Sequence, residues 1–242
     1  SRTTGQVASA YWPGFALLLT PFTAMGVPWL GNPLLGACGI WVVQRLVLEL
    51  TRSHEAAGAA ALFMVGSGAY MVYSISFYSM TAHLVCNAAF ALLLLKPSFG
   101  RCLAAGFIGG LALCLHNPVP HLFFAAPWLI WLAWRREWRH LTALAAAYLP
   151  WVILIGFGWY QLLHGLADGR AVAGSTGSDD LLLDAFRIFA GIFSIPTPVQ
   201  LTDRMIELAK LWLWAAPALA LFAAAGYRMH RADRRWNLLF AS

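Results

Sequence analysis

Residues 106–140, GFIGGLALCLHNPVPHLFFAAPWLIWLAWRREWRH, contain the pattern that decides the fold. No Lys, Arg, Asp or Glu occurs between Arg101 and Arg135, and the only polar break in this apolar run is HNPVPH at 116–121. Pro118 suits the first turn of a helix, and a cluster of arginines closes the second apolar run. The stretch predicts two apolar helices joined by a polar turn, which is typical of membrane-spanning segments.

The composition of the whole chain agrees with this pattern. Of its 242 residues, 60% are hydrophobic and only 11% are charged. Soluble domains have about 45–50% apolar and about 25% charged residues, and one soluble core of this size could not bury so much apolar surface. Disorder requires low hydrophobicity and high charge, so it is excluded as well. The chain is expected to be an integral, multi-pass membrane protein with room for about seven or eight spans.

The net charge of +6 comes from Lys and Arg residues in small clusters between apolar runs. Such clusters are typical of membrane orientation signals, so no nucleic-acid partner is expected. The four cysteines lie in or beside apolar runs without a Cys-x-x-Cys motif, and we interpret them as buried free thiols. The chain lacks an initiator Met and a signal peptide, and 236–242 resembles the start of another span, so a fragment is expected.

These features predict an all-α transmembrane helix bundle of about seven spans, in one domain covering 1–242. Residues 11–30 carry three prolines and are assigned to an N-terminal interfacial or re-entrant helix. Asn32-Pro33 is interpreted as a helix start with Asn32 as the N-cap, and the polar stretch 164–205 as an extracytoplasmic loop. The expected spans are about 33–50, 59–78, 81–95, 102–115, 118–134, 141–163 and 206–226. Gly106-x-x-x-Gly110 and Gly66-Ser67-Gly68 are interpreted as small-residue contacts between helices.

The turns that alternate along these spans divide the basic residues unequally. By the positive-inside rule, the face with more Lys and Arg is cytoplasmic, which places the Asp-rich loop and the N-terminal segment outside. Eleven of the 16 basic residues fall on the cytoplasmic face: Arg45, Arg52, Lys96, Arg101, Arg135, Arg136, Arg139, Arg228, Arg231, Arg234 and Arg235.

Three histidines are expected to meet near the outer face: His83, His116 and His121. Polar groups inside a membrane bundle are costly and tend to be functional. The first hypothesis is a polar cavity that opens outward and holds an anionic head group or a metal; the alternative is interfacial histidines that cap helix ends and meet water. The neighbouring hydrogen-bonding residues are Tyr78, Ser79, Thr81, Asn87 and Asn117.

No cofactor is expected, although a divalent metal stays open. Asp179-Asp180 in the outer loop suits either a divalent ion or a base, and equally the N-cap of a surface helix over 181–193. A zinc site at the histidines lacks the support of an HExxH motif or of paired cysteines.

Four segments together resemble the GT-C superfamily of membrane glycosyltransferases, in the branch related to protein O-mannosyltransferases and the lipid A aminoarabinose transferase. They are YWPGFALLL (11–19), PWLGNPLLGA (28–37), SISFYSMTAHL (74–84) and GFIGGLALCLHNPVPHLFFAAPWLIWL (106–132). The resemblance covers about 11–134. This chain departs from the family where relatives commonly have Ser-His-Thr and Thr-Arg-Pro, because it has Ser79-Met80-Thr81 and His116-Asn117-Pro118.

The resemblance implies a glycosyltransferase that uses a polyprenyl-phosphate-linked sugar donor at the outer face of a bacterial inner membrane, or an incomplete core of one. It implies substrate binding by Tyr78, Ser79, Thr81, His83, His116, Asn117 and His121, with the lipid-linked donor and membrane lipids as partners. The family's carboxylate base belongs to a loop before Tyr11, so the catalytic residue is expected upstream of this chain. The alternatives are a non-catalytic transporter or lipid-handling membrane protein, and a membrane scaffold.

Overall fold

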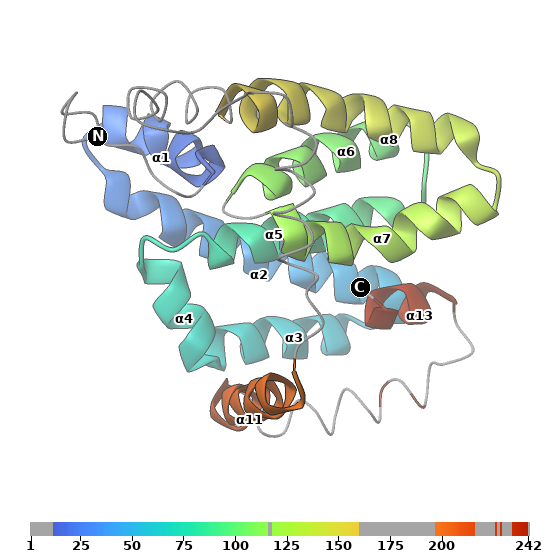
Figure 1. Cartoon of the computed structure of the whole chain (residues 1–242). Coiled ribbons are helices and arrows are strands. Elements are labelled where there is room, and N and C mark those ends of the chain that lie inside the picture. The colour runs from blue at the N-terminus through green and yellow to red at the C-terminus, as the bar shows by residue number, and fades with distance from the viewer. Residues whose placement is uncertain are drawn as a thin grey trace. The chain divides into compact units, whose positions relative to one another are not determined.

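The computed structural model describes residues 12–115, 118–159, 197–215, 226, 228 and 234–241. Every regular element among them is helical, so the all-α prediction is confirmed (Figure 1). The chain divides into two units, Ala8–Leu163 with Ala223–Ser242, and Ser1–Val7 with His164–Phe222. The larger unit contains α1 (Gly14–Ala24), η1 (Pro28–Leu30), α2 (Gly31–Thr51), α3 (His54–Gly66), α4 (Gly68–Ile75), α5 (Met80–Leu94), α6 (Phe99–Cys114), α7 (Pro118–Trp134), α8 (Trp138–Trp151), η2 (Val152–Phe157) and α13 (Arg234–Ala241); the smaller contains α11 (Pro198–Ala215).

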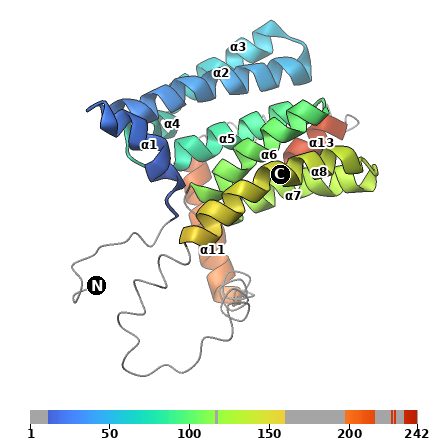
Figure 2. The same cartoon turned by 90° about the horizontal axis from the view of Figure 1, so that it is seen from above.

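The helices of the larger unit pack side by side. α2 packs against α3 and α5, α6 packs against α5 and α8, and α13 packs against α7 (Figure 2). The main core lies where α5, α6, α7 and α8 meet, and its largest wholly buried side chains are Trp128, Phe90, Leu94, Leu132 and Leu144. A second core around Ala82, Cys86, Ala112 and Leu115 is covered by α1 through Phe15 and Leu18.

One prediction about small residues is confirmed, because α6 approaches α8 through glycines. A Cβ added at Gly106 would lie 2.2 Å from the Leu144 carbonyl oxygen, and one at Gly110 would lie 2.2 Å from Trp151 Cδ1. Neither position has room for a side chain, so these glycines set the spacing of the two helices.

The interpretation of Gly66-Ser67-Gly68 as a helix contact is wrong, because a Cβ at Gly66 or Gly68 would meet no atom within 4 Å. These residues instead break the expected span 59–78 into α3 and α4, which are bent by 66°. Ser67 has an extended backbone, and its Oγ accepts a hydrogen bond from the Tyr70 amide at 3.3 Å. The segment therefore ends one helix and caps the next.

The assignment of Asn32 as an N-cap is also wrong. Helix α2 begins at Gly31, and its N-cap residue, Leu30, makes no side-chain cap hydrogen bond. Asn32 lies inside the first turn and donates from Nδ2 to the carbonyl oxygens of Tyr73 at 3.3 Å, of Ser76, and of Tyr78 at 2.9 Å. The side chain donates to carbonyls of the last turn of α4 and of the residues after it, where the end of the helix leaves carbonyl groups without amide partners.

Two stretches of the described residues are long and apolar enough to cross a membrane, Pro28–Thr51 and Trp138–Ile155, and the bent pair α3–α4 is a third if it counts as one span. Helices α5, α6 and α7 have 15, 16 and 17 residues. At 1.5 Å per residue they fall short of a hydrocarbon core of about 30 Å. The prediction of seven spans therefore stays a prediction.

Other boundaries differ from the expected ones in detail. Helix α8 continues into the π-helical η2 just after Pro150, a residue that cannot donate an α-helical hydrogen bond. Helix α11 begins at Pro198, inside the range assigned to the outer loop, while residues 160–196, with Asp179 and Asp180, lie outside the described residues. All four cysteines are free; three are buried, but Cys38 is exposed.

Candidate functional site

The short turns between α5, α6, α7 and α8 give the larger unit two distinct ends. The starts of α5 and α7 and the ends of α6 and α8 lie at one end, here called the histidine end after His83 and His121. The opposite end, here called the basic end, contains the turn between α5 and α6 and the turn between α7 and α8.

A hydrogen-bonded group of three side chains lies inside the bundle toward the histidine end. His121 of α7 is wholly buried; its Nδ1 lies 2.6 Å from Asn87 Oδ1 of α5, and its Nε2 lies 2.6 Å from Tyr148 Oη of α8. Because a carboxamide oxygen can only accept, Nδ1–H donates to Asn87, which leaves Nε2 to accept from the Tyr148 hydroxyl. The imidazole is therefore a neutral link between two helices.

Phe90 and Gly109 pack closely against this network. The ring of Phe90 meets the imidazole edge to face, with ring centroids 5.2 Å apart. On the α6 side, a Cβ at Gly109 would lie 2.1 Å from Tyr148 Oη and 2.8 Å from His121 Nε2. Gly109 therefore makes the room in which the hydroxyl and the imidazole meet.

The predicted site residues divide into three groups. His83 precedes Asn87 by one helical turn on α5 and is buried, as are Ser79 and Thr81 at the start of the same helix. The structure thus brings His83 and His121 to the same end of the bundle. Tyr78 is 63% exposed, and its ring packs edge-on against the ring of Tyr73, with the ring centroids 6.3 Å apart. His116 and Asn117 lie outside the described residues.

Sequence reasoning missed Tyr148, which closes the network. It stands in the run ALAAAYLPW (143–151) of α8, where one hydroxyl among apolar residues is a signal for an internal hydrogen bond. Its partner is 27 positions away, so the pattern indicates a need for a partner but not which residue meets it.

Thr81 offers a second polar group in this region. Thr81 is 2% exposed, and its Oγ1 is buried without a hydrogen-bond partner among the described residues. Buried hydroxyls are normally bonded, so this oxygen is suited to a ligand or a water molecule. Together, Thr81, Ser79 and His83 place polar side chains on the first turn and a half of α5.

The basic end has a different character. Glu49 Oε2 accepts from Lys96 Nζ at 2.5 Å and lies 3.6 Å from Arg52 Nη1, while Arg235 donates to the Glu49 carbonyl oxygen at 3.4 Å. Arg101 donates to the carbonyls of Leu92 and Leu93 at 2.6 and 3.0 Å. The structure therefore places at this end four basic residues that the sequence assigns to the cytoplasmic face: Arg52, Lys96, Arg101 and Arg235.

Within the described part of the chain, no three His, Cys, Asp or Glu side chains are placed to hold a metal ion. No protein-family model, curated protein or solved structure matches this chain. A function therefore has to rest on the chain's own residues.

Proposed function

We propose that this chain is a multi-pass protein of a bacterial inner membrane that binds a polyprenyl-phosphate-linked sugar at the histidine end. It transfers the sugar, or it forms the membrane core of a GT-C-type glycosyltransferase. The observation that carries the proposal is the concentration of polar side chains inside one end of an otherwise apolar bundle: Ser79, Thr81, His83 and His121 are buried, and Asn87 and Tyr148 are half-buried. Polar groups at such depth are expensive unless they serve a substrate or hold the bundle together.

The exposed surface supports placement in a membrane. Large apolar side chains lie on the outside of the helices, among them Leu62 at 74%, Ile75 at 69% and Trp134 at 83% exposed. Soluble monomers rarely expose apolar surface on this scale. By the positive-inside rule, the basic end faces the cytoplasm and the histidine end faces the periplasm.

The chemistry assigned to these residues is the binding of the donor. The hydroxyls of Ser79 and Thr81 and the imidazole of His83 supply hydrogen bonds to phosphate oxygens. Donors aimed at a leaving phosphate stabilise the charge that develops as the sugar departs. Asn87, His121 and Tyr148 position α5, α7 and α8 and do not themselves bind substrate, since both imidazole nitrogens are already engaged.

The test is binding of a radiolabelled polyprenyl-phosphate sugar to the full chain in liposomes. A hydrogen bond to a charged group contributes about 1.5–3 kcal/mol, so His83→Ala and Thr81→Val should each weaken binding roughly tenfold or more. The matched control is His54→Ala, an exposed histidine at the start of α3. Unchanged binding in both site variants, or an equal loss in the control, contradicts the proposal.

A non-catalytic transporter or lipid-handling protein is the second candidate, and the break between α3 and α4 favours it. Discontinuous membrane helices often form the substrate sites of transporters, and these two helices are bent by 66° at Ser67. In sealed liposomes, release of the sugar from the donor would identify a transferase. Movement of the intact donor across the bilayer would identify a transporter.

A further inference from the structure

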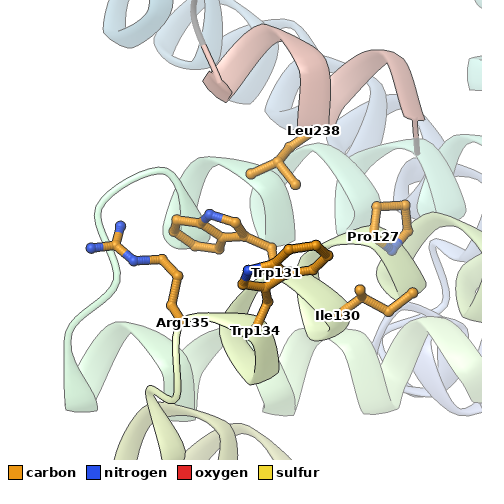
Figure 3. Close-up of a pocket in the computed structure, with 6 residues that line it drawn as sticks. All are labelled: Pro127, Ile130, Trp131, Trp134, Arg135 and Leu238. Atoms are coloured by element: carbon orange, nitrogen blue, oxygen red, sulfur yellow. The ribbon is translucent and has the colours of Figure 1, made fainter.

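A groove between α7 and α13, far along α7 from His121, is the second place where the fold offers a binding surface. It has a volume of about 420 Å³ and is lined by Pro127, Ile130, Trp131, Trp134, Arg135 and Leu238. Figure 3 shows the two indoles between Arg135 on one side and Pro127 and Ile130 on the other, with Leu238 reaching in from α13. We call this the Trp–Arg groove; its volume lies in the range of small-molecule sites.

The lining has the chemistry of an amphipathic ligand. All residues except Arg135 are apolar, and Ile130 and Trp134 are 62% and 83% exposed. In a membrane, such side chains meet acyl chains, and tryptophans at the end of a span lie at the head-group level. The groove therefore suits a hydrocarbon chain along its floor and a polar head group at Arg135.

The guanidinium of Arg135 is positioned to bind an anion at the edge of the groove. Its guanidinium lies 5.4 Å from the centre of the Trp131 ring, which fixes the side chain at the edge of the groove, and the side chain is 48% exposed. Nε faces Glu137 Oε1 at 3.7 Å, a long ion pair, while Glu137 Oε2 is bonded to His140 Nδ1 at 2.6 Å. Within the part of the chain that the structure describes, the terminal nitrogens of Arg135 make no hydrogen bond or ion pair, so they are available to a phosphate.

The charge around the groove has the matching sign. Arg136 follows in the same turn, Arg139 lies at the start of α8, and Glu137 is the single acidic residue among them. The net positive charge at this end favours an anionic head group over a zwitterionic one.

From these observations we infer that the Trp–Arg groove is a binding site for an anionic phospholipid of the basic-end leaflet, with one acyl chain against Trp131 and Trp134 and its phosphate on Arg135. The inference depends on the membrane placement in the proposed function, but not on any sugar chemistry. It assigns to α7 a second role, at the end opposite His121.

The experiment uses the full chain in vesicles of phosphatidylcholine with a minor fraction of phosphatidylglycerol. Bromine on the acyl chain of one lipid or the other quenches nearby tryptophans, and the ratio of the two quenching efficiencies gives the selectivity for the anionic lipid. The wild-type chain should prefer brominated phosphatidylglycerol. Arg135→Gln should lower that preference about fivefold, the factor that corresponds to the ~1 kcal/mol of one basic side chain near an anionic surface.

The matched control is Arg45→Gln. Arg45 lies over the Trp41 ring at 5.8 Å, so it forms the same kind of cation–π pair on α2, outside the groove. It should leave the preference within twofold of the wild type. Leu238→Trp, which fills the groove with an indole from α13, should remove the preference while Arg135 stays in place.

Equal quenching by the two lipids in the wild type overturns the inference. So does an equal loss in Arg45→Gln, because the selectivity would then belong to the general surface charge. If lipid selectivity fails while donor binding at the histidine end is retained, the proposed function stands alone. If no lipid quenches the tryptophans, the membrane placement fails and both proposals fall with it.

Discussion

Gly109 is a position in α6 that has no room for a side chain. In Gly109→Ala, the new Cβ would lie 2.1 Å from Tyr148 Oη and 2.8 Å from His121 Nε2, so the hydroxyl has to leave the imidazole. Overpacking a tight core costs about 1–3 kcal/mol, and leaving a buried polar group without its partner costs a further ~1–3 kcal/mol. We therefore expect the variant to lose about 3 kcal/mol of stability.

The measurement is thermal unfolding of the full chain in detergent micelles. For a chain of this size, 3 kcal/mol corresponds to a fall in Tm of about 6–12 °C. The matched control is Gly100→Ala on the same helix, where a Cβ would meet no atom within 4 Å. That variant should be neutral or stabilised by up to ~1 kcal/mol, because alanine favours the helix.

A second substitution separates the clash from a general effect on α6. Tyr148→Phe removes the oxygen that the new Cβ would strike, so Gly109→Ala in the Tyr148→Phe background should cost less than it does in the wild type. Residues in direct contact give such coupling, whereas independent sites add. If Gly109→Ala unfolds at the temperature of Gly100→Ala, or if the two effects are strictly additive, the described network is wrong.

Three further predictions concern the other polar contacts. Asn32→Ala should lower the stability of the chain by about 1–3 kcal/mol, and Asn32→Asp should lower it more, because a carboxylate has no donor for the carbonyls of Tyr73, Ser76 and Tyr78. Protease cleavage at 76–79 should rise in the same order, and the reverse order would refute these contacts. Glu49→Gln should lower the free energy of unfolding by less than ~1 kcal/mol, because the side chains of Lys96 and Arg52 are about half exposed or more; a larger loss of stability in the same thermal unfolding experiment would contradict this. Thr197→Ala should reduce the helix content of a peptide covering α11 and lower the stability of its helix by about 0.5–2 kcal/mol. At the start of that helix, the Thr197 amide donates to Gln200 Oε1 at 3.0 Å and the Gln200 amide donates to Thr197 Oγ1 at 3.3 Å. An unchanged circular dichroism spectrum of the peptide would exclude this cap.

Local signals in the sequence predicted the helices well wherever apolar runs end at strong breaks. Helix α7, Pro118–Trp134, has the expected bounds, since a proline opens it and arginines close it. The pattern Thr197-Pro198-Val199-Gln200 was equally readable, because a hydroxyl residue, a proline and a glutamine at this spacing form a capping box. It lay in a stretch assigned to a loop for its polarity, and polarity alone says little about an exposed helix.

The errors arise where one residue type serves two purposes. An asparagine before a proline resembles an N-cap, but Asn32 bonds carbonyls 41 to 46 positions away. A Gly-Ser-Gly segment resembles a helix contact, but at 66–68 it breaks a helix, while the glycines of α6 do form such a contact. Which use applies depends on the neighbouring helix, and a single sequence does not contain that information.

The polar network and the glycine face of α6 belong to one physical solution. Between lipid tails, apolar burial gives helices little reason to associate, so association depends on close approach through small residues and on hydrogen bonds between helices. Gly106 and Gly110 bring α6 onto α8, and Gly109 between them admits the Tyr148 hydroxyl to His121. Asn87, His121 and Tyr148 therefore hold the bundle together, whereas the proposed function assigns donor binding to Ser79, Thr81 and His83 at the start of α5. Two results would separate assembly from function in this protein. A substitution at Gly109 should lower stability while the protein that stays folded still binds the donor. Substitutions at His83 or Thr81 should weaken donor binding without lowering stability.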